Sequence, residues 1–186
     1  MTDVLINVAG DRGRVLQSQP VTPFHLTETA LRGARMYLGT TGMIAVDVDH
    51  SLYAILANPA DSGVNLYVSE RWFDSNRASG SVPLEYTAYL NPTAILAETS
   101  NPINLRLGGA ASNATFRYEM GDNLAMGGIT GSAAPIPTGG LRSILTLGVI
   151  IPPGNSLGFR IDGGGANINQ AARIGISFVF YEETVN

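Results

Sequence analysis

Apolar residues in this chain alternate with polar ones over short runs, and clusters of Gly, Pro, Asn, Asp and Ser separate the runs. A period of two is typical of β-strands, and the separating residues are strong turn formers. Strands are expected over residues 36–38, 43–48, 52–57, 64–69, 84–90, 95–97, 103–107, 115–120, 141–151, 157–161 and 174–181. Roughly nine to eleven strands without intervening helices predict an all-β, antiparallel sandwich or barrel.

The last third of the chain has the clearest pattern. Two apolar runs, 141–151 and 174–181, are rich in Ile, Val and Phe, and Pro-Pro-Gly and Gly-Gly-Gly turns lie between them. Alternate residues of an extended strand face the same side. We therefore expect the late strands to supply much of the core, through Ile144, Leu147, Val149, Phe159, Ile174, Ile176, Phe178 and Phe180.

One early connection is a turn by its composition. Residues 58–63 have the sequence Asn-Pro-Ala-Asp-Ser-Gly and lie between the strand patterns of residues 52–57 and 64–69. Strands separated by such a short turn usually pair with each other. The sequence therefore predicts an antiparallel hairpin here.

A second connection is much longer. Residues 120–140 are rich in Gly and have no apolar periodicity, which predicts one long loop. Such loops in compact domains are usually functional or disordered, and a Gly-rich loop is entropically costly to order alone. We expect an assembly surface that becomes ordered against a partner, with Met126, Ile129 and Ile136 as its contact residues.

The N-terminal residues 1–26 are interpreted as an arm, followed by a single β-sandwich domain over residues 27–186. In the arm, Val4, Ile6 and Val8 share one face of a short strand and Leu5 lies on the other. Such a strand is either an edge strand of its own domain or is exchanged and pairs with an open sheet edge of a neighbouring subunit. We predict that these four residues make intermolecular contacts.

Composition narrows the classes of function. Only 14% of the 186 residues are charged, whereas an average soluble domain has about 25%. The shortfall suggests that neighbouring copies cover part of the surface. The formal charge of −4 is small and the Arg residues are scattered, so no basic stripe is available for a phosphate backbone. A homo-oligomer is therefore favoured, and nucleic acid is not an expected partner.

Two further observations concern compartment and membrane. The absence of Cys excludes disulfides, thiolate metal sites and cysteine nucleophiles. The segment Met1–Asn7 lacks the basic region and long apolar stretch of a secretory signal. No apolar run approaches the roughly 18 residues of a membrane helix, so a membrane is not an expected partner either.

Candidate catalytic and metal-binding residues are few. Asp47, Asp49 and His50 are close in sequence, but in a strand His50 points away from the two carboxylates. The pattern of a calcium loop is missing, and no Gly-x-Ser-x-Gly accompanies His25 or His50. Residues 163–165 lead to another strand rather than to a helix, which does not fit a phosphate loop. The chain is therefore expected not to be an enzyme and to bind no cofactor or metal.

Aromatic residues suggest one further kind of ligand. Trp72 and Phe73 follow Arg71 and could form a platform for a sugar, although aromatics are also ordinary core residues. Tyr86 and Tyr89 are an odd number of residues apart and so lie on opposite faces of their strand. Trp72 is therefore the candidate glycan contact.

Three segments resemble structural proteins of tailed-phage particles. Leu56–Val68 is similar to their Asn-Pro-x-x-Ser-Gly turn followed by a strand. Ile150–Leu157 contains their Pro-Pro-Gly-x-Ser before a late strand, and Ile176–Glu183 looks like their last strand. The resemblance implies an antiparallel jelly-roll-like β-sandwich, often trimeric, that decorates a capsid or forms part of a fibre or tail.

The resemblance thus implies a non-enzymatic virion structural protein whose partners are copies of itself, most simply in a trimer, and capsid or other virion proteins. Two alternatives stay open. Subunits of extracellular or cell-surface bacterial fibres look similar and donate an N-terminal strand to the next subunit, although they often rely on cysteines for cross-linking. A carbohydrate- or receptor-binding module would instead use the aromatic residues around Trp72.

Overall fold

The computed structural model describes residues 35–46, 50–76, 84–136, 142–162 and 172–185, together with the backbone of two short strands near the N-terminus. All regular structure in these residues is β, which confirms the predicted class. The strands are β1 Val4–Leu5, β2 Val15–Leu16, β3 Met36–Thr40, β4 Ile44–Val46, β5 Ser51–Ala57, β6 Val64–Ser75, β7 Leu84–Leu90, β8 Glu98–Ser100, β9 Ile103–Asn104, β10 Thr115–Gly121, β11 Ile129–Ile136, β12 Arg142–Ile151, β13 Ser156–Asp162 and β14 Ala172–Thr184.

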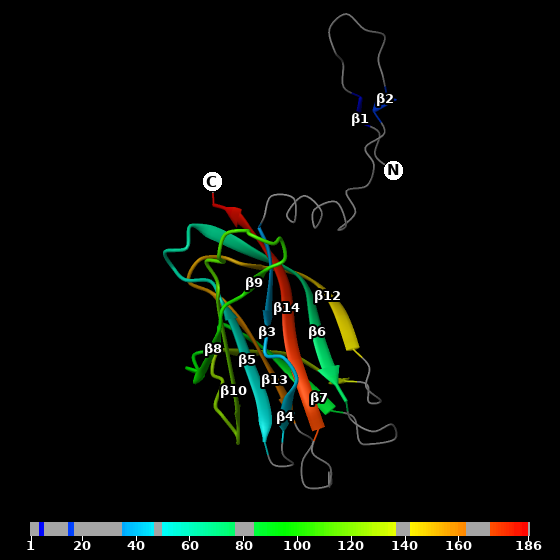
Figure 1. Cartoon of the computed structure of the whole chain (residues 1–186), viewed down its shortest axis with the longest axis vertical. Coiled ribbons are helices and arrows are strands. Elements are labelled where there is room, and N and C mark those ends of the chain that lie inside the picture. The colour runs from blue at the N-terminus through cyan, green and yellow to red at the C-terminus, as the bar shows by residue number, and fades with distance from the viewer. Residues whose placement is uncertain are drawn as a thin grey trace, which may run out of the picture.

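Two antiparallel sheets form the body of the molecule (Figure 1). In the first, called the β14 sheet, the order is β12-β6-β14-β3-β9, and β4 also pairs with β14. In the second, called the β5 sheet, the order is β11-β7-β13-β5-β10-β8. Successive long strands mostly alternate between the sheets, so the chain crosses repeatedly from one layer to the other.

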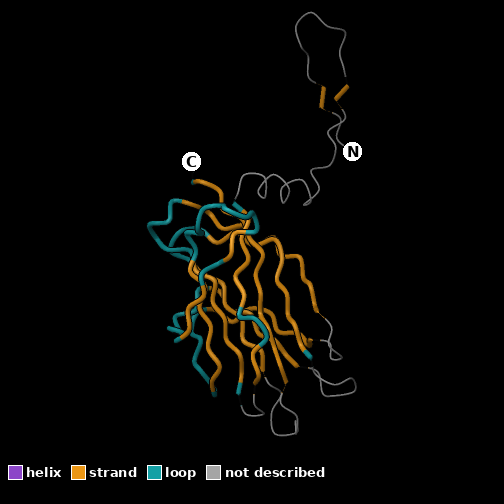
Figure 2. Tube along the Cα trace, in the orientation of Figure 1, coloured by secondary structure: helices purple, strands orange, loops and turns teal. Residues whose placement is uncertain are grey.

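Several connections gather at the end of the sandwich where the C-terminus lies (Figure 2). They comprise residues 58–63, 101–114 and 152–155, and this end is called the loop end. Backbone hydrogen bonds join two of them, from Asn58 N to Asn155 O (2.9 Å) and from Gly154 N to Asn58 O (2.8 Å). The loop end is therefore an ordered part of the domain.

The main core lies between the two sheets. Alternating residues of β14 are fully buried in it and face aromatic residues of β6, β10 and β13. The prediction for the late strands is confirmed for Val149, Phe159, Ile174, Ile176, Phe178 and Phe180. The side chains of Ile144 and Leu147 lie outside the described part of the chain.

A second, smaller core covers the outer face of the β5 sheet. Residues 91–97 and 122–128 pack over this face, and Met126 is buried there with Tyr53 of β5. The Tyr53 hydroxyl accepts a hydrogen bond from the Leu124 amide at 3.0 Å. Tyr89 packs against this cluster while Tyr86 lies in the main core, as their odd spacing predicts.

The predicted hairpin at residues 58–63 is wrong. The two strands that flank this turn, β5 and β6, lie in different sheets. The buried Asn58 side chain explains the path, because its amide donates to Val64 O (2.7 Å) and to Ile151 O (2.8 Å). These bonds direct the chain across the loop end instead of back along its own sheet.

The predicted single loop over residues 120–140 is also wrong, because β11 occupies Ile129–Ile136 and pairs with β7. Five of its eight residues in succession are exposed at the edge of the sheet, so the strand shows no alternation of apolar residues. The strands expected at 95–97 and 103–107 differ as well: the first region precedes β8, and the second contains only the two residues of β9.

The predicted arm lies mostly outside the described residues, including Ile6 and Val8. Its described part is a ladder in which Val4 pairs with Leu16 and Leu5 with Val15. This two-stranded ladder belongs to neither of the two large sheets. The intermolecular role of the arm stays a prediction.

Candidate functional site

The loop residues predicted for assembly have different surroundings. Met126 is buried in the small outer core and Ile136 in the main core, so both side chains contact their own domain. Ile129 is 66% exposed. Of the three, only Ile129 has an exposed apolar side chain.

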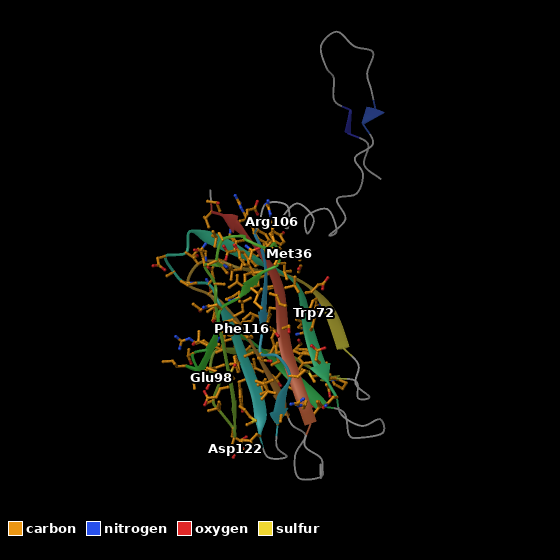
Figure 3. The ribbon with its side chains drawn as sticks, in the orientation of Figure 1. Met36, Trp72, Glu98, Arg106, Phe116 and Asp122 are labelled. Atoms are coloured by element: carbon orange, nitrogen blue, oxygen red, sulfur yellow. The ribbon has the colours of Figure 1, made fainter. Side chains whose placement is uncertain are left out.

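The candidate glycan contact, Trp72, lies on the outer face of the β14 sheet (Figure 3). It is half-buried, and its ring nitrogen donates a hydrogen bond to Glu70 Oε2 at 2.8 Å. Tyr67 and Tyr181 stack on the same face with ring centroids 4.8 Å apart. Hydrogen bonding with Glu183 raises the pKa of Tyr67, and burial raises that of Tyr181.

Residues considered for acid–base or metal chemistry do not form a cluster among the described residues. His25, Asp47 and Asp49 lie outside them. His50 Nε2 lies 3.8 Å from Asp122 Oδ1. The described residues contain no group of three His, Cys, Asp or Glu that could hold a metal ion, and no helix able to cross a membrane.

A buried charge lies in the main core. The Arg71 guanidinium is held within 5.0 Å of the ring centroids of Phe73, Tyr86 and Phe159. Its Nη2 donates a 2.6 Å hydrogen bond to the Tyr86 hydroxyl, and Nε has no hydrogen-bond partner. Burial lowers the pKa of Arg71, because the charged form loses water. Cation–π contacts offset part of that loss.

At the loop end, a buried carboxylate organises residues 101–114. Glu182 of β14 accepts hydrogen bonds from the Ser112 hydroxyl (2.6 Å), the Asn113 amide (2.7 Å) and the Asn113 side chain (3.0 Å). Hydrogen bonds to a carboxylate are stronger than those between neutral groups. The last residues of this loop are therefore fixed to the domain.

The first residues of the same loop are fixed as well. The Asn104 side chain donates to Ala110 O at 2.7 Å and accepts from the Arg106 amide at 2.9 Å. Gly109 closes a turn by donating to Arg106 O at 2.9 Å, and the Leu105 amide donates to Met36 O at 2.9 Å. Figure 3 shows Arg106 beside Met36 at the loop end, away from Asp122.

This ordered loop exposes apolar side chains. Leu107 lies in the turn and is 99% exposed, and Ile103 and Leu105 are also exposed. Arg106 is the only charged residue in the segment 101–114. The loop end thus presents exposed apolar side chains from a hydrogen-bonded loop.

A second apolar surface lies at the other side of the loop end. Four residues of the β5 sheet form one row across neighbouring strands and face the core: Leu56, Leu157, Leu90 and Ile129. Their exposed fractions rise along the row from 0% and 3% to 45% and 66%. The last two residues, called the Leu90 corner, therefore face the core side but are only partly covered by it.

Sequence reasoning missed the 101–114 loop and the Leu90 corner. A signal for the loop existed, because Leu105 and Leu107 flank the lone Arg106 directly before Gly-Gly in a segment with many small residues. The corner had no local signal, because Leu90 and Ile129 become neighbours only through the pairing of β7 with β11.

Comparisons of the chain with protein-family models, with curated proteins and with solved structures yield no match.

Proposed function

We propose that this chain is a non-enzymatic structural protein of a virus particle that associates with copies of itself and with other virion proteins. On this proposal it decorates a phage capsid or forms part of a fibre or tail. The observation that carries it is the exposed apolar surface at the loop end, where Leu107 lies on a hydrogen-bonded loop and Leu90 and Ile129 lie on paired strands. Contiguous exposed apolar patches, unlike single exposed side chains, often mark sites of protein–protein contact.

The strand order supports the jelly-roll part of this proposal. Four long strands of one sheet follow the order β12-β6-β14-β3, and four of the other follow β11-β7-β13-β5. Each pair of facing edges joins strands that succeed one another in the chain, as in two interleaved Greek keys. The short strands β8 and β9, with β10, then form an insertion between β7 and β11.

The mass of the purified protein in solution tests the proposal. Light scattering over a range of concentrations should give a defined homo-oligomer, with a trimer expected from the resemblance of Leu56–Val68, Ile150–Leu157 and Ile176–Glu183 to phage structural proteins. Co-sedimentation with a capsid should then show binding to the particle. A monodisperse monomer that binds no particle would refute it.

An alternative is a bacterial extracellular fibre subunit that polymerises by strand donation. The observation that favours it is that the ladder of β1 and β2 belongs to neither large sheet. An open-ended series of masses, lost when residues 1–20 are deleted, would favour the fibre. Binding to a glycan array that is lost in Trp72→Ala would instead favour a carbohydrate- or receptor-binding module.

A further inference from the structure

Leu107 differs from most exposed apolar residues because it lies on a hydrogen-bonded loop. Single exposed apolar residues are common on soluble proteins and by themselves indicate no contact. Here a buried carboxylate and an Asn side chain hold the residues on both sides of the turn, and Leu107 points away from the domain. A fixed loop that holds a leucine 99% exposed, with Ile103 and Leu105 nearby, is suited to insert that side chain into another molecule.

The Leu90 corner could receive such a side chain, because its two residues face the core side but are only partly covered. Leu90 and Ile129 continue a row of core residues and face the same side as the fully buried Leu56. An apolar side chain placed against them would extend the core by one more contact. Strand β11 has no charged residue, so such a contact would bury no charge from that strand.

The two surfaces lie at the same end of the molecule. Thr115, which follows the loop, pairs with Ala57, and Leu157 of the corner row pairs with Leu56. Both surfaces are therefore about level with the last residues of β5.

They also lie on opposite sides. The loop joins β9 to β10 on the side where β3 faces β10, since Gly39 approaches Phe116. The corner lies on the side where β6 faces β7, since Phe73 and Tyr86 are in ring contact. Copies placed side by side, with their long axes in the same direction, would bring the loop of one to the corner of the next.

We propose that Leu107 of one copy packs against Leu90 and Ile129 of a second copy of this chain. This inference rests on the proposed self-association and names its contact. The contact joins two different surfaces, so it is heterologous, and repetition closes a ring when the rotation between copies permits. A ring built this way would have the loop ends of all subunits on one face.

Charge substitutions test the contact first. Leu107→Asp and Ile129→Asp should each raise the dissociation constant about tenfold or more, because a carboxylate would be buried against apolar groups. Ile95→Asp is the matched control, since Ile95 is 85% exposed on another loop and outside both surfaces. Unchanged melting temperatures would show that the variants are folded.

Cysteine cross-linking tests the proximity directly, and the absence of native Cys makes it specific. A mixture of Leu107→Cys and Ile129→Cys copies should form a covalent dimer under mild oxidation, about tenfold faster than a mixture of Ile95→Cys with Ile129→Cys. One chain carrying both Leu107→Cys and Ile129→Cys should give a ladder that ends at the size of the ring.

The outcomes separate the contact from the proposed function. A wild-type oligomer that Leu107→Asp leaves intact, or whose Leu107→Cys and Ile129→Cys copies do not cross-link, would overturn the contact while self-association stands. Rapid cross-linking of Leu107→Cys copies with one another would overturn it too, because the loop would then meet its own counterpart. A wild-type monomer at every concentration would remove the proposed self-association itself.

Discussion

At the scale of single residues, the described part of the sandwich contains two buried charges, Glu182 and Arg71, with different partners. Glu182 receives three hydrogen bonds, so its desolvation is compensated by donors. Arg71 is held mainly by aromatic rings and by one hydroxyl, and among the described residues it has no carboxylate partner. Buried charges often contribute less than an apolar side chain of the same size, whereas removing one partner of a pair is harmful.

This difference predicts the behaviour of Arg71 and Tyr86. Tyr86→Phe should lower the free energy of unfolding by about 1.5–3 kcal/mol, because the guanidinium loses its hydrogen-bond acceptor. The double variant Arg71→Met and Tyr86→Phe should be more stable than Tyr86→Phe alone, because it removes the buried charge as well. Urea unfolding measures both. Arg71→Met alone completes the cycle. If the changes in unfolding free energy of the two single variants add up to that of the double variant, Arg71 and Tyr86 do not act as a unit.

At the scale of elements, local pattern predicted the strands that alternate and are half or fully buried. The expected strand at residues 84–90 coincides with β7. Of the expected late-strand core residues, Val149, Phe159, Ile174, Ile176, Phe178 and Phe180 lie in or against the main core. Pattern failed at β11, whose exposed edge needs no alternation, and at the turn after β5, where Asn58 directs the chain to the other sheet. Both failures concern contacts between segments far apart in sequence.

The candidate site was less predictable for the same reason. The carboxylate that orders the 101–114 loop belongs to Glu182, which lies 70 residues after Ser112 in the chain. Of the predicted assembly residues, Ile129 is exposed, and Met126 and Ile136 are covered by their own domain. A sequence pattern identifies an apolar residue, but the pairing of distant strands decides whether a partner can reach it.

The ordering of the loop by Glu182 can be tested at this scale. Glu182→Gln should lower the free energy of unfolding by about 2–3 kcal/mol, since an amide replaces a charged acceptor of several hydrogen bonds. Amide exchange of residues 103–113 should rise at the same time. Glu183→Gln is the control, because Glu183 is exposed on the same strand and hydrogen-bonds with Tyr67 rather than with the loop. Unchanged protection in Glu182→Gln would mean that Asn104 alone holds the loop.

The small outer core allows a second test on an element. A Cβ at Gly158 would lie 2.8 Å from Met126 Cε and 2.9 Å from Pro92 Cγ, so these residues would have to move away from β13. Gly158→Ala should therefore lower the free energy of unfolding by about 1–3 kcal/mol through overpacking. Gly148→Ala is the control, since a Cβ there meets nothing within 4 Å. Equal stability of the two variants would contradict the packing of residues 92 and 126 on the sheet.

At the scale of the whole molecule, the sandwich is complete without β1 and β2. The two large sheets take their strands from β3 onwards, and the ladder of Val4–Leu5 with Val15–Leu16 has only two residue pairs. Two paired residues bury little surface, so this ladder contributes little to the stability of the domain. We therefore expect the apolar side chains of the arm to contact a neighbouring subunit.

Deletion of residues 1–20 should therefore affect assembly more than stability. The melting temperature of the deleted protein should stay within about 2–4 °C of the full chain, the shift expected for a loss of roughly 1 kcal/mol in a domain of this size. Its oligomer should dissociate at higher protein concentration, as measured by light scattering. The deletion can also be combined with Leu107→Asp. If the arm and the loop contribute separately to the assembly, the combined variant should dissociate at a higher protein concentration than either variant alone. A large fall in melting temperature with an intact oligomer would instead place the arm in the core of its own domain.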